Sequence, residues 1–185
     1  MRFLAISGSL RAGSSNTALL QAARLVAPPD VEVVLYEGLA DLPAFNPDLD
    51  TMEGERLPEA ARELRALVAS ADGILICSPE YAHGIPGSLK NALDWLVGSV
   101  EFPFKPVALL KANAHSVHAQ EQLVEVLTTM NGRVVEEASV TVALPSRGMS
   151  ASDIAADGAI ASQLRAALDA LRTVAGPARS SGARS

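Results

Sequence analysis

The chain has 185 residues and a net charge of −6, with 49% hydrophobic and 19% charged residues. This length is typical of one domain with a sizeable core. Lys and Arg occur singly along the sequence, which argues against a nucleic-acid groove. No apolar run approaches the roughly 20 residues of a membrane span. A single cysteine, Cys77, excludes an intrachain disulfide, and we expect a cytoplasmic protein without nucleic-acid or membrane partners.

Short apolar runs alternate with stretches of helical periodicity along the chain. Strands are expected at 2–7, 31–36, 73–77, 107–110 and 133–142, and helices at 17–27, 57–71, 86–97, 120–130 and 160–171. The segment 176–185 is rich in Gly, Ser and Arg and predicts a disordered tail. Residues 1–175 would then form a single domain.

The alternation of five strands with five helices predicts a parallel α/β sheet built from right-handed crossovers. Because the strands are continuously apolar, helices should cover both faces of the sheet. We expect a flavodoxin-like three-layer sandwich with strand order 2-1-3-4-5. Such sheets bind ligands beyond the carboxyl ends of the strands, where the strand order reverses. The loops 8–16 and 78–87 should meet at that switch point.

The first of these loops has the residue types of an anion site. Gly8 and Gly13 allow tight turns, and the helix that follows offers free N–H groups and a partial positive charge to a phosphate. Hydroxyl groups, an amide and a guanidinium gather here, and Arg11 could bind a phosphate through charge-assisted bonds. Gly8 and Gly13 have the spacing of a nucleotide P-loop, but Ser14 stands where its Lys would be, and the loop does not match a dinucleotide fingerprint. The alternative is an ordinary capped turn. The candidate ligands are Ser9, Arg11, Ser14, Ser15 and Asn16.

The second loop is stiffened by prolines and glycines, so its backbone could hold the edge of a planar heterocycle. Tyr81 would pack on such a ring or on a partner subunit, or serve as a surface anchor. Glu80 has the alternative role of a structural hydrogen-bond acceptor, and His83 that of a surface histidine. Cys77, on an apolar strand, is interpreted as an inert buried thiol. The candidate ring contacts are Pro79, Glu80, Tyr81, His83 and Gly84.

Together, these loops resemble the NADPH-dependent FMN reductases, whose relatives include quinone, azo-dye and chromate reductases. The resemblance is carried by residues 7–16, 42–49, 78–81 and 86–95, and it extends from residue 2 to about 110. Two long motifs in the right order make it specific. It implies a flavodoxin fold with FMN at the switch point, its phosphate in the first loop and its isoalloxazine ring against the second.

The resemblance also implies an activity. Hydride would pass from NADPH or NADH to FMN and then to free flavin, a quinone or a similar small acceptor, by a ping-pong route. The flavin carries this chemistry, so we name no catalytic residue and expect no metal. The alternatives are a flavodoxin-type electron carrier and a flavin-free binding relative. Family members are dimers or tetramers, and Trp95 beside an apolar helical stripe is interpreted as an interface residue, with a place in the core of its own chain as the alternative.

The chain departs from the family after the fourth expected strand. Many relatives have a glycine-rich stretch there, whereas residues 111–118 contain no glycine. We assign Asn113 and His115 in this segment to cofactor binding. Lys111 and His115 would bring positive charge to the reduced flavin, and the alternative is that both face solvent.

Overall fold

The computed structural model describes residues 1–50, 56–113, 117–146 and 148–176. Its parallel sheet has the order β2-β1-β3-β4-β5, as the sequence predicted, and β6 also pairs with β4. The register places Ile6 of β1 between Tyr36 of β2 and Ile76 of β3. The carboxyl ends of these three strands therefore lie side by side. The strands are β1 (Arg2–Ser7), β2 (Glu32–Tyr36), β3 (Gly73–Cys77), β4 (Pro106–Lys111), β5 (Arg133–Val134) and β6 (Val140–Thr141).

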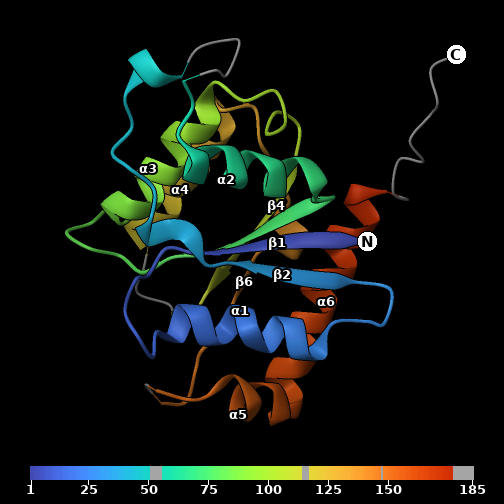
Figure 1. The fold of residues 1–185 in the computed structure, drawn as a ribbon. Coiled ribbons are helices and arrows are strands. Elements are labelled where there is room, and N and C mark those ends of the chain that lie inside the picture. The colour runs from blue at the N-terminus through green and yellow to red at the C-terminus, as the bar shows by residue number, and fades with distance from the viewer. Residues whose placement is uncertain (51–55, 114–116, 147, 177–185) are drawn as a thin grey trace, which may run out of the picture.

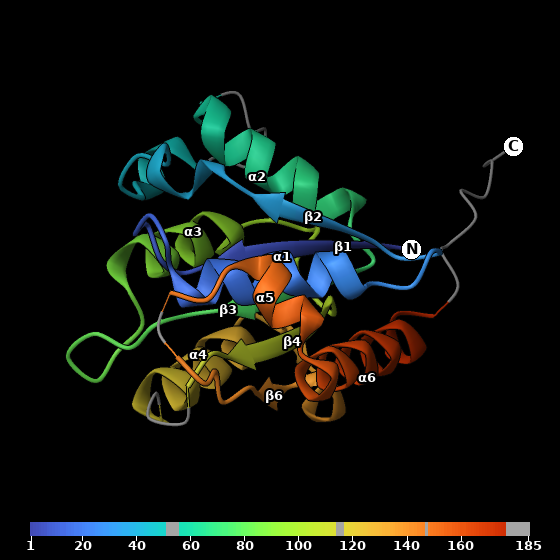
Figure 2. The same ribbon diagram turned by 90° about the horizontal axis from the view of Figure 1, so that it is seen from below.

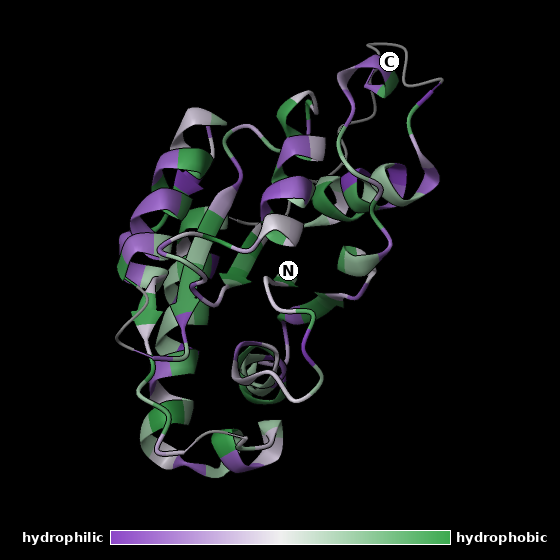
Figure 3. Cartoon of the chain, turned by 90° about the vertical axis from the view of Figure 1, so that its left-hand side faces the viewer, coloured by the Kyte–Doolittle hydropathy of each residue, from purple (hydrophilic) through white to green (hydrophobic). Residues whose placement is uncertain are grey.

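Helices cover both faces of the sheet, as expected (Figures 1 and 2). Successive residues of β1 point to opposite faces: Phe3 and Ala5 join one apolar cluster, and Leu4 and Ile6 join the other. This double burial explains the continuous apolar strands, which Figure 3 shows in the hydrophobic colour. The first face carries α1 (Ser15–Val26), α5 (Ala151–Ala156) and α6 (Gly158–Ala175), and the second α2 (Glu59–Ser70), α3 (Gly87–Val97) and α4 (Val117–Thr129).

The last strand differs from its prediction. Instead of one strand over 133–142, the short strands β5 and β6 flank the 3₁₀ turn η3 (Glu136–Ala138), and both pair with the outer edge of β4. Ser139 bridges the gap, because its hydroxyl accepts from Leu109 N–H (3.0 Å) and donates to the Val135 carbonyl (2.8 Å). The acidic pair in η3 is a poor strand former, which accounts for the interruption.

The helix α5 was not predicted from the sequence. Its start carries a capping box in which Ser150 accepts from Asp153 N–H, and Asp153 accepts from Ser150 N–H. The Ser-x-x-Asp spacing was a readable signal for it. Asp157 then caps α6 by accepting from the N–H groups of Ala159 and Ile160. Two further short turns, η1 (Gly38–Ala40) and η2 (Pro47–Leu49), follow β2.

None of the helices within the described ranges is both long enough and apolar enough to cross a membrane. Helix α6 ends at Ala175. The predicted tail lies outside the described residues from position 177 onward.

Candidate functional site

The first loop begins where β1 ends and is tied to β3 at once. Gly8 N–H donates to the Cys77 carbonyl (2.8 Å), and Ser9 and Arg11 donate their N–H groups to the hydroxyls of Ser7 and Ser9, each at 3.3 Å. Gly13 has φ +68°, and a Cβ built there would meet nothing within 4 Å. The loop therefore reverses through Gly13 beside open space before α1 starts.

The N-terminus of α1 retains its capacity to bind an anion. Ser14 is the buried N-cap and accepts from Asn16 N–H (3.2 Å), while no acidic residue lies in the first turn. The positive end of the helix dipole is thus not neutralised by the helix itself. The exposed Arg11 guanidinium makes no hydrogen bond or ion pair within the described ranges. Free N–H groups, a hydroxyl and an uncommitted cation are the donors that suit a phosphate.

Asn16 has a contact that the sequence did not suggest. Its side chain is buried, and its Oδ1 accepts a hydrogen bond from the Cys77 thiol (3.3 Å). Desolvation by burial raises the pKa of Cys77 above its ordinary value. This agrees with its interpretation as an inert buried thiol. The contact joins the first turn of α1 to the end of β3.

The two candidate loops touch at Gly8. A Cβ built at Gly8 would lie 2.6 Å from Ser78 Oγ and 3.1 Å from Leu89 Cδ2. Only glycine allows the first loop to lie this close to the start of the second. The two loops therefore meet between the carboxyl ends of β1 and β3, which is the predicted switch point.

The second loop contains a two-residue β-hairpin. Tyr81 and Gly84 exchange backbone hydrogen bonds of 3.0 Å in both directions. The central residues Ala82 and His83 have φ values of 49° and 60°, as a type I′ turn requires. Neither is glycine, so each left-handed residue costs roughly 1 kcal/mol or more. The hairpin projects from the sheet with Tyr81 and His83 exposed (Figure 1, at the left).

Helix α4 supports this hairpin at three points. Glu80 Oε2 accepts from Ala119 N–H in the first turn of α4 (3.0 Å), and Gln122 Oε1 accepts from Ile85 N–H (2.8 Å). The rings of His83 and His118 stack with centroids 4.2 Å apart. Glu80 is thus a structural acceptor, the alternative that the sequence left open. Gln122 and His118 were missed, because no local pattern links them to a loop more than 30 residues away.

The loop after β2 is held by α3. Asn91 accepts from Phe45 N–H (2.8 Å) and donates to the Pro43 carbonyl (2.9 Å). Trp95 Nε1 donates to the same carbonyl (2.8 Å), and the Trp95 ring meets Phe45 edge-on. Trp95 is fully buried in its own chain. Its interpretation as an interface residue is therefore wrong, because the large ring fills the core and anchors this loop.

A nearly buried ion pair holds the same loop at Asp50. Arg65 of α2 pairs with Asp50 at 2.7 Å, and their side chains are 13% and 10% exposed. Arg65 Nε also donates to the Trp95 carbonyl in the last turn of α3 (2.9 Å). The pair thus joins the loop to two helices.

The remaining candidates lie at the end of β4 and directly beyond it. Asn113 is exposed two residues beyond the end of this strand, on the same edge as the loops, and Lys111 is its last residue. His115 lies outside the described residues.

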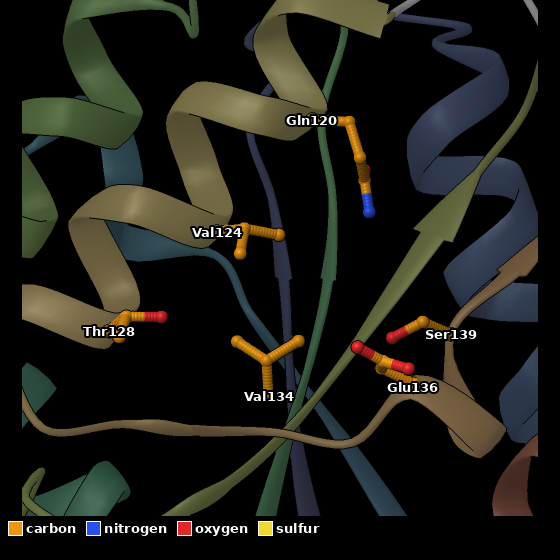
Figure 4. Close-up of a pocket in the computed structure, with 6 residues that line it drawn as sticks. All are labelled: Gln120, Val124, Thr128, Val134, Glu136 and Ser139. Atoms are coloured by element: carbon orange, nitrogen blue, oxygen red, sulfur yellow. The ribbon is translucent and has the colours of Figure 1, made fainter.

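A cavity of about 330 Å³ lies between α4 and the segment from β5 to Ser139 (Figure 4). None of the candidate cofactor residues lines it. Its walls are Gln120, Val124, Thr128, Val134, Glu136 and Ser139.

Comparisons with known proteins agree with this architecture. The chain is 39% identical over 116 residues to an NAD(P)H-dependent FMN reductase of Pseudomonas aeruginosa (62% of this chain, 60% of that protein). It is 35% identical over 111 residues to a quinone reductase of Escherichia coli (59% and 58%). The matches thus span about three fifths of the length of these curated relatives.

Solved structures extend the likeness over nearly the whole chain. FerB, a flavoenzyme NAD(P)H:(acceptor) oxidoreductase of Paracoccus denitrificans, superposes with a TM-score of 0.69 at 26% identity, over 92% of this chain and 96% of that one. An archaeal flavodoxin superposes with a TM-score of 0.60 at 15% identity, over 95% and 100%, which shows the flavodoxin-like fold alone. Residues 1–145 match the family described as NADPH-dependent FMN reductase. The chain belongs to the NADPH-dependent FMN reductase family.

Proposed function

We propose that this chain is a cytoplasmic FMN-dependent oxidoreductase that takes electrons from NADPH or NADH and reduces a quinone, free flavin or similar small acceptor. The observation that carries the proposal is the α1 N-terminus at the switch point. It is capped by Ser14, carries no acidic residue in its first turn and lies next to the uncommitted Arg11. An anionic phosphate suits this donor set, and family membership supports FMN as its source.

The first loop would hold the phosphate. The hydroxyls of Ser9 and Ser15, the Arg11 guanidinium and the first N–H groups of α1 are the donors on offer. Ser14 contributes mainly by fixing the start of the helix, because its hydroxyl already accepts from Asn16 N–H. Asn16 Oδ1 already accepts a hydrogen bond from Cys77, so Asn16 would contact the phosphate through its side-chain nitrogen Nδ2.

The second loop would orient the ring. Its hairpin offers backbone groups from Pro79 to Gly84 and an exposed Tyr81 side chain, and Asn113 follows the neighbouring strand. Bound FMN would supply the hydride chemistry in a ping-pong cycle, so that the protein needs no acid or base of its own. The role of these residues is to set the distance and orientation of the reactants.

The test is anaerobic mixing of the purified, FMN-loaded protein with excess NADPH or NADH. We expect loss of the flavin absorption, followed by its recovery on adding a quinone, and parallel double-reciprocal plots in the steady state. If neither nucleotide bleaches the flavin, the protein is an electron carrier and the reductase proposal fails. If the protein binds no FMN, it is a flavin-free relative.

The proposed role of Arg11 has its own test. Arg11→Ala should weaken FMN binding by roughly 1.5–3 kcal/mol, which is the scale of a hydrogen bond to a charged group. Riboflavin lacks the phosphate and should lose much less affinity. Equal losses for FMN and riboflavin in fluorescence titrations would show that Arg11 does not bind the phosphate.

The proposal includes assembly into a homodimer or homotetramer. Its support is family membership, since Trp95 is committed to the core. Sedimentation velocity at micromolar concentration should show a particle at least twice the 19.2 kDa of the chain. A single species of chain mass would rule out the assembly.

A further inference from the structure

We propose that Gln122 of α4 is a positioning residue for the flavin ring, because it fixes the backbone of the hairpin over residues 81–84 from outside. The inference rests on the proposed FMN function and deepens it. In this view α4 stabilises the hairpin, because the hydrogen bonds within the hairpin stabilise it only weakly.

The hairpin needs such support. Within it, one pair of backbone bonds between Tyr81 and Gly84 opposes two non-glycine residues in the left-handed region, Ala82 and His83. The tip is exposed, so no apolar core contributes there. A turn of this kind persists where its surroundings impose it, and α4 contacts the loop through Gln122, Ala119 and His118.

Gln122 contacts the chain directly after the hairpin, at Ile85. Its Oε1 accepts from Ile85 N–H at 2.8 Å, and the same oxygen would lie 3.1 Å from a Cβ at Gly84. The oxygen therefore fixes the backbone N–H of Ile85 and lies close beside Gly84. The bond lies at the surface, so its loss should change the global stability little.

Glu80 fixes the other end of the hairpin on the same turn of α4. Helix α4 has no acidic residue in its own first turn, and the Glu80 carboxylate supplies one from the loop by accepting from Ala119 N–H. Ala119 and Gln122 are three residues apart and thus lie on neighbouring positions of one helix face. Both ends of the hairpin are therefore held by one rigid element, which sets the position of the backbone groups offered to the ring.

The chain offers a matched control two residues away. Gln120 lies on the same helix but about 200° around its axis from Gln122. Its side chain points into the cavity along α4 (Figure 4). Gln120→Leu therefore makes the same chemical change on the same helix without touching the hairpin.

The experiment compares Q122L, Q122A, Q122E and Q120L with the wild type. FMN and riboflavin affinities are measured by fluorescence titration, and amide hydrogen exchange at Gly84 and Ile85 is measured without flavin. We expect Q122L and Q122A to weaken both flavins equally, by roughly five- to tenfold, which is the scale of one neutral hydrogen bond. Exchange at Ile85 should rise in both variants. Q122E keeps the acceptor oxygen and should stay within about twofold of the wild type, as should Q120L.

Each outcome bears on a separate claim. If Q122L and Q122A bind both flavins like the wild type while exchange at Ile85 rises, Gln122 does not position the ring. If only FMN weakens, the effect is on the phosphate and the inference is wrong. If the wild type binds no flavin, the proposed function fails and the inference falls with it. In Q122A the space beside Gly84 stays open, whereas the larger Leu of Q122L could crowd it. A loss of flavin affinity in Q122L alone would therefore come from crowding, and that result also refutes the inference.

Discussion

Substituting Gly8 tests whether the two candidate loops depend on their close approach. In Gly8→Ala the new Cβ would lie 2.6 Å from Ser78 Oγ and 3.1 Å from both Ser78 Cβ and Leu89 Cδ2. Leu89 is fully buried and has little room to move. Ser78 must therefore rotate away from its hydrogen bond to the Pro79 carbonyl (3.0 Å), or the loops must separate.

The expected loss of stability follows from these contacts. Overpacking a well-filled site costs roughly 1–3 kcal/mol, and the displaced Ser78 hydrogen bond is worth about 1 kcal/mol. We expect Gly8→Ala to lower the free energy of unfolding by about 2 kcal/mol. Ser78→Ala removes the atom nearest to the new Cβ. The destabilisation of the double variant should therefore be about 1 kcal/mol smaller than the sum of the destabilisations of the two single variants.

The assay is urea unfolding of the wild type, both single variants and the double variant. Gly13→Ala serves as the control, because Gly13 has φ +68° and open space around it. Its loss of about 1 kcal/mol should come from backbone strain and should add to that of Ser78→Ala without coupling. Strict additivity between Gly8→Ala and Ser78→Ala would refute the contact between the loops.

Three further changes test the surrounding structure. Burial and two nearby carboxylates raise the pKa of Tyr36 to about 12 from 10. The contribution of Tyr36 to the free energy of unfolding should therefore be fully present below pH 10 and fall between pH 10 and pH 12, where only the unfolded state loses the proton. Tyr36→Phe should remove this fall and cost little at pH 7, since the buried hydroxyl has no partner within the described part of the chain; unfolding followed against pH checks both. Asp50→Ala should destabilise by about 3 kcal/mol, because it leaves Arg65 charged and nearly buried, and a loss below 1 kcal/mol in urea would contradict this. The hydrogen bond from Arg172 lowers the pKa of Asp30, so Arg172→Gln should raise that pKa toward its usual range in an NMR titration, where no change would exclude the pair.

The amino-acid sequence by itself determined the sheet and the meeting point of its loops. The strand Arg2–Ser7 is apolar at each of its four inner positions because both faces of the sheet are covered, and this pattern predicts parallel βαβ units. In such a sheet the carboxyl ends of adjacent strands meet at one edge. The loops 8–16 and 78–87 therefore had to be neighbours, and the structure places them in contact at Gly8. Their roles toward FMN stay predictions.

Only the tertiary structure decided what individual side chains contact. Asn16 meets Cys77 across 61 positions, Trp95 meets Pro43 across 52, and Gln122 meets Ile85 across 37. These partners depend on the rotation of each helix about its axis, which is set by packing against the sheet. Local patterns reveal which face of a helix is apolar, but not which distant backbone group lies within 3 Å of a given polar side chain. The physical reason is that a hydrogen bond is sensitive to shifts of a few tenths of an ångström, whereas hydrophobic burial is not directional.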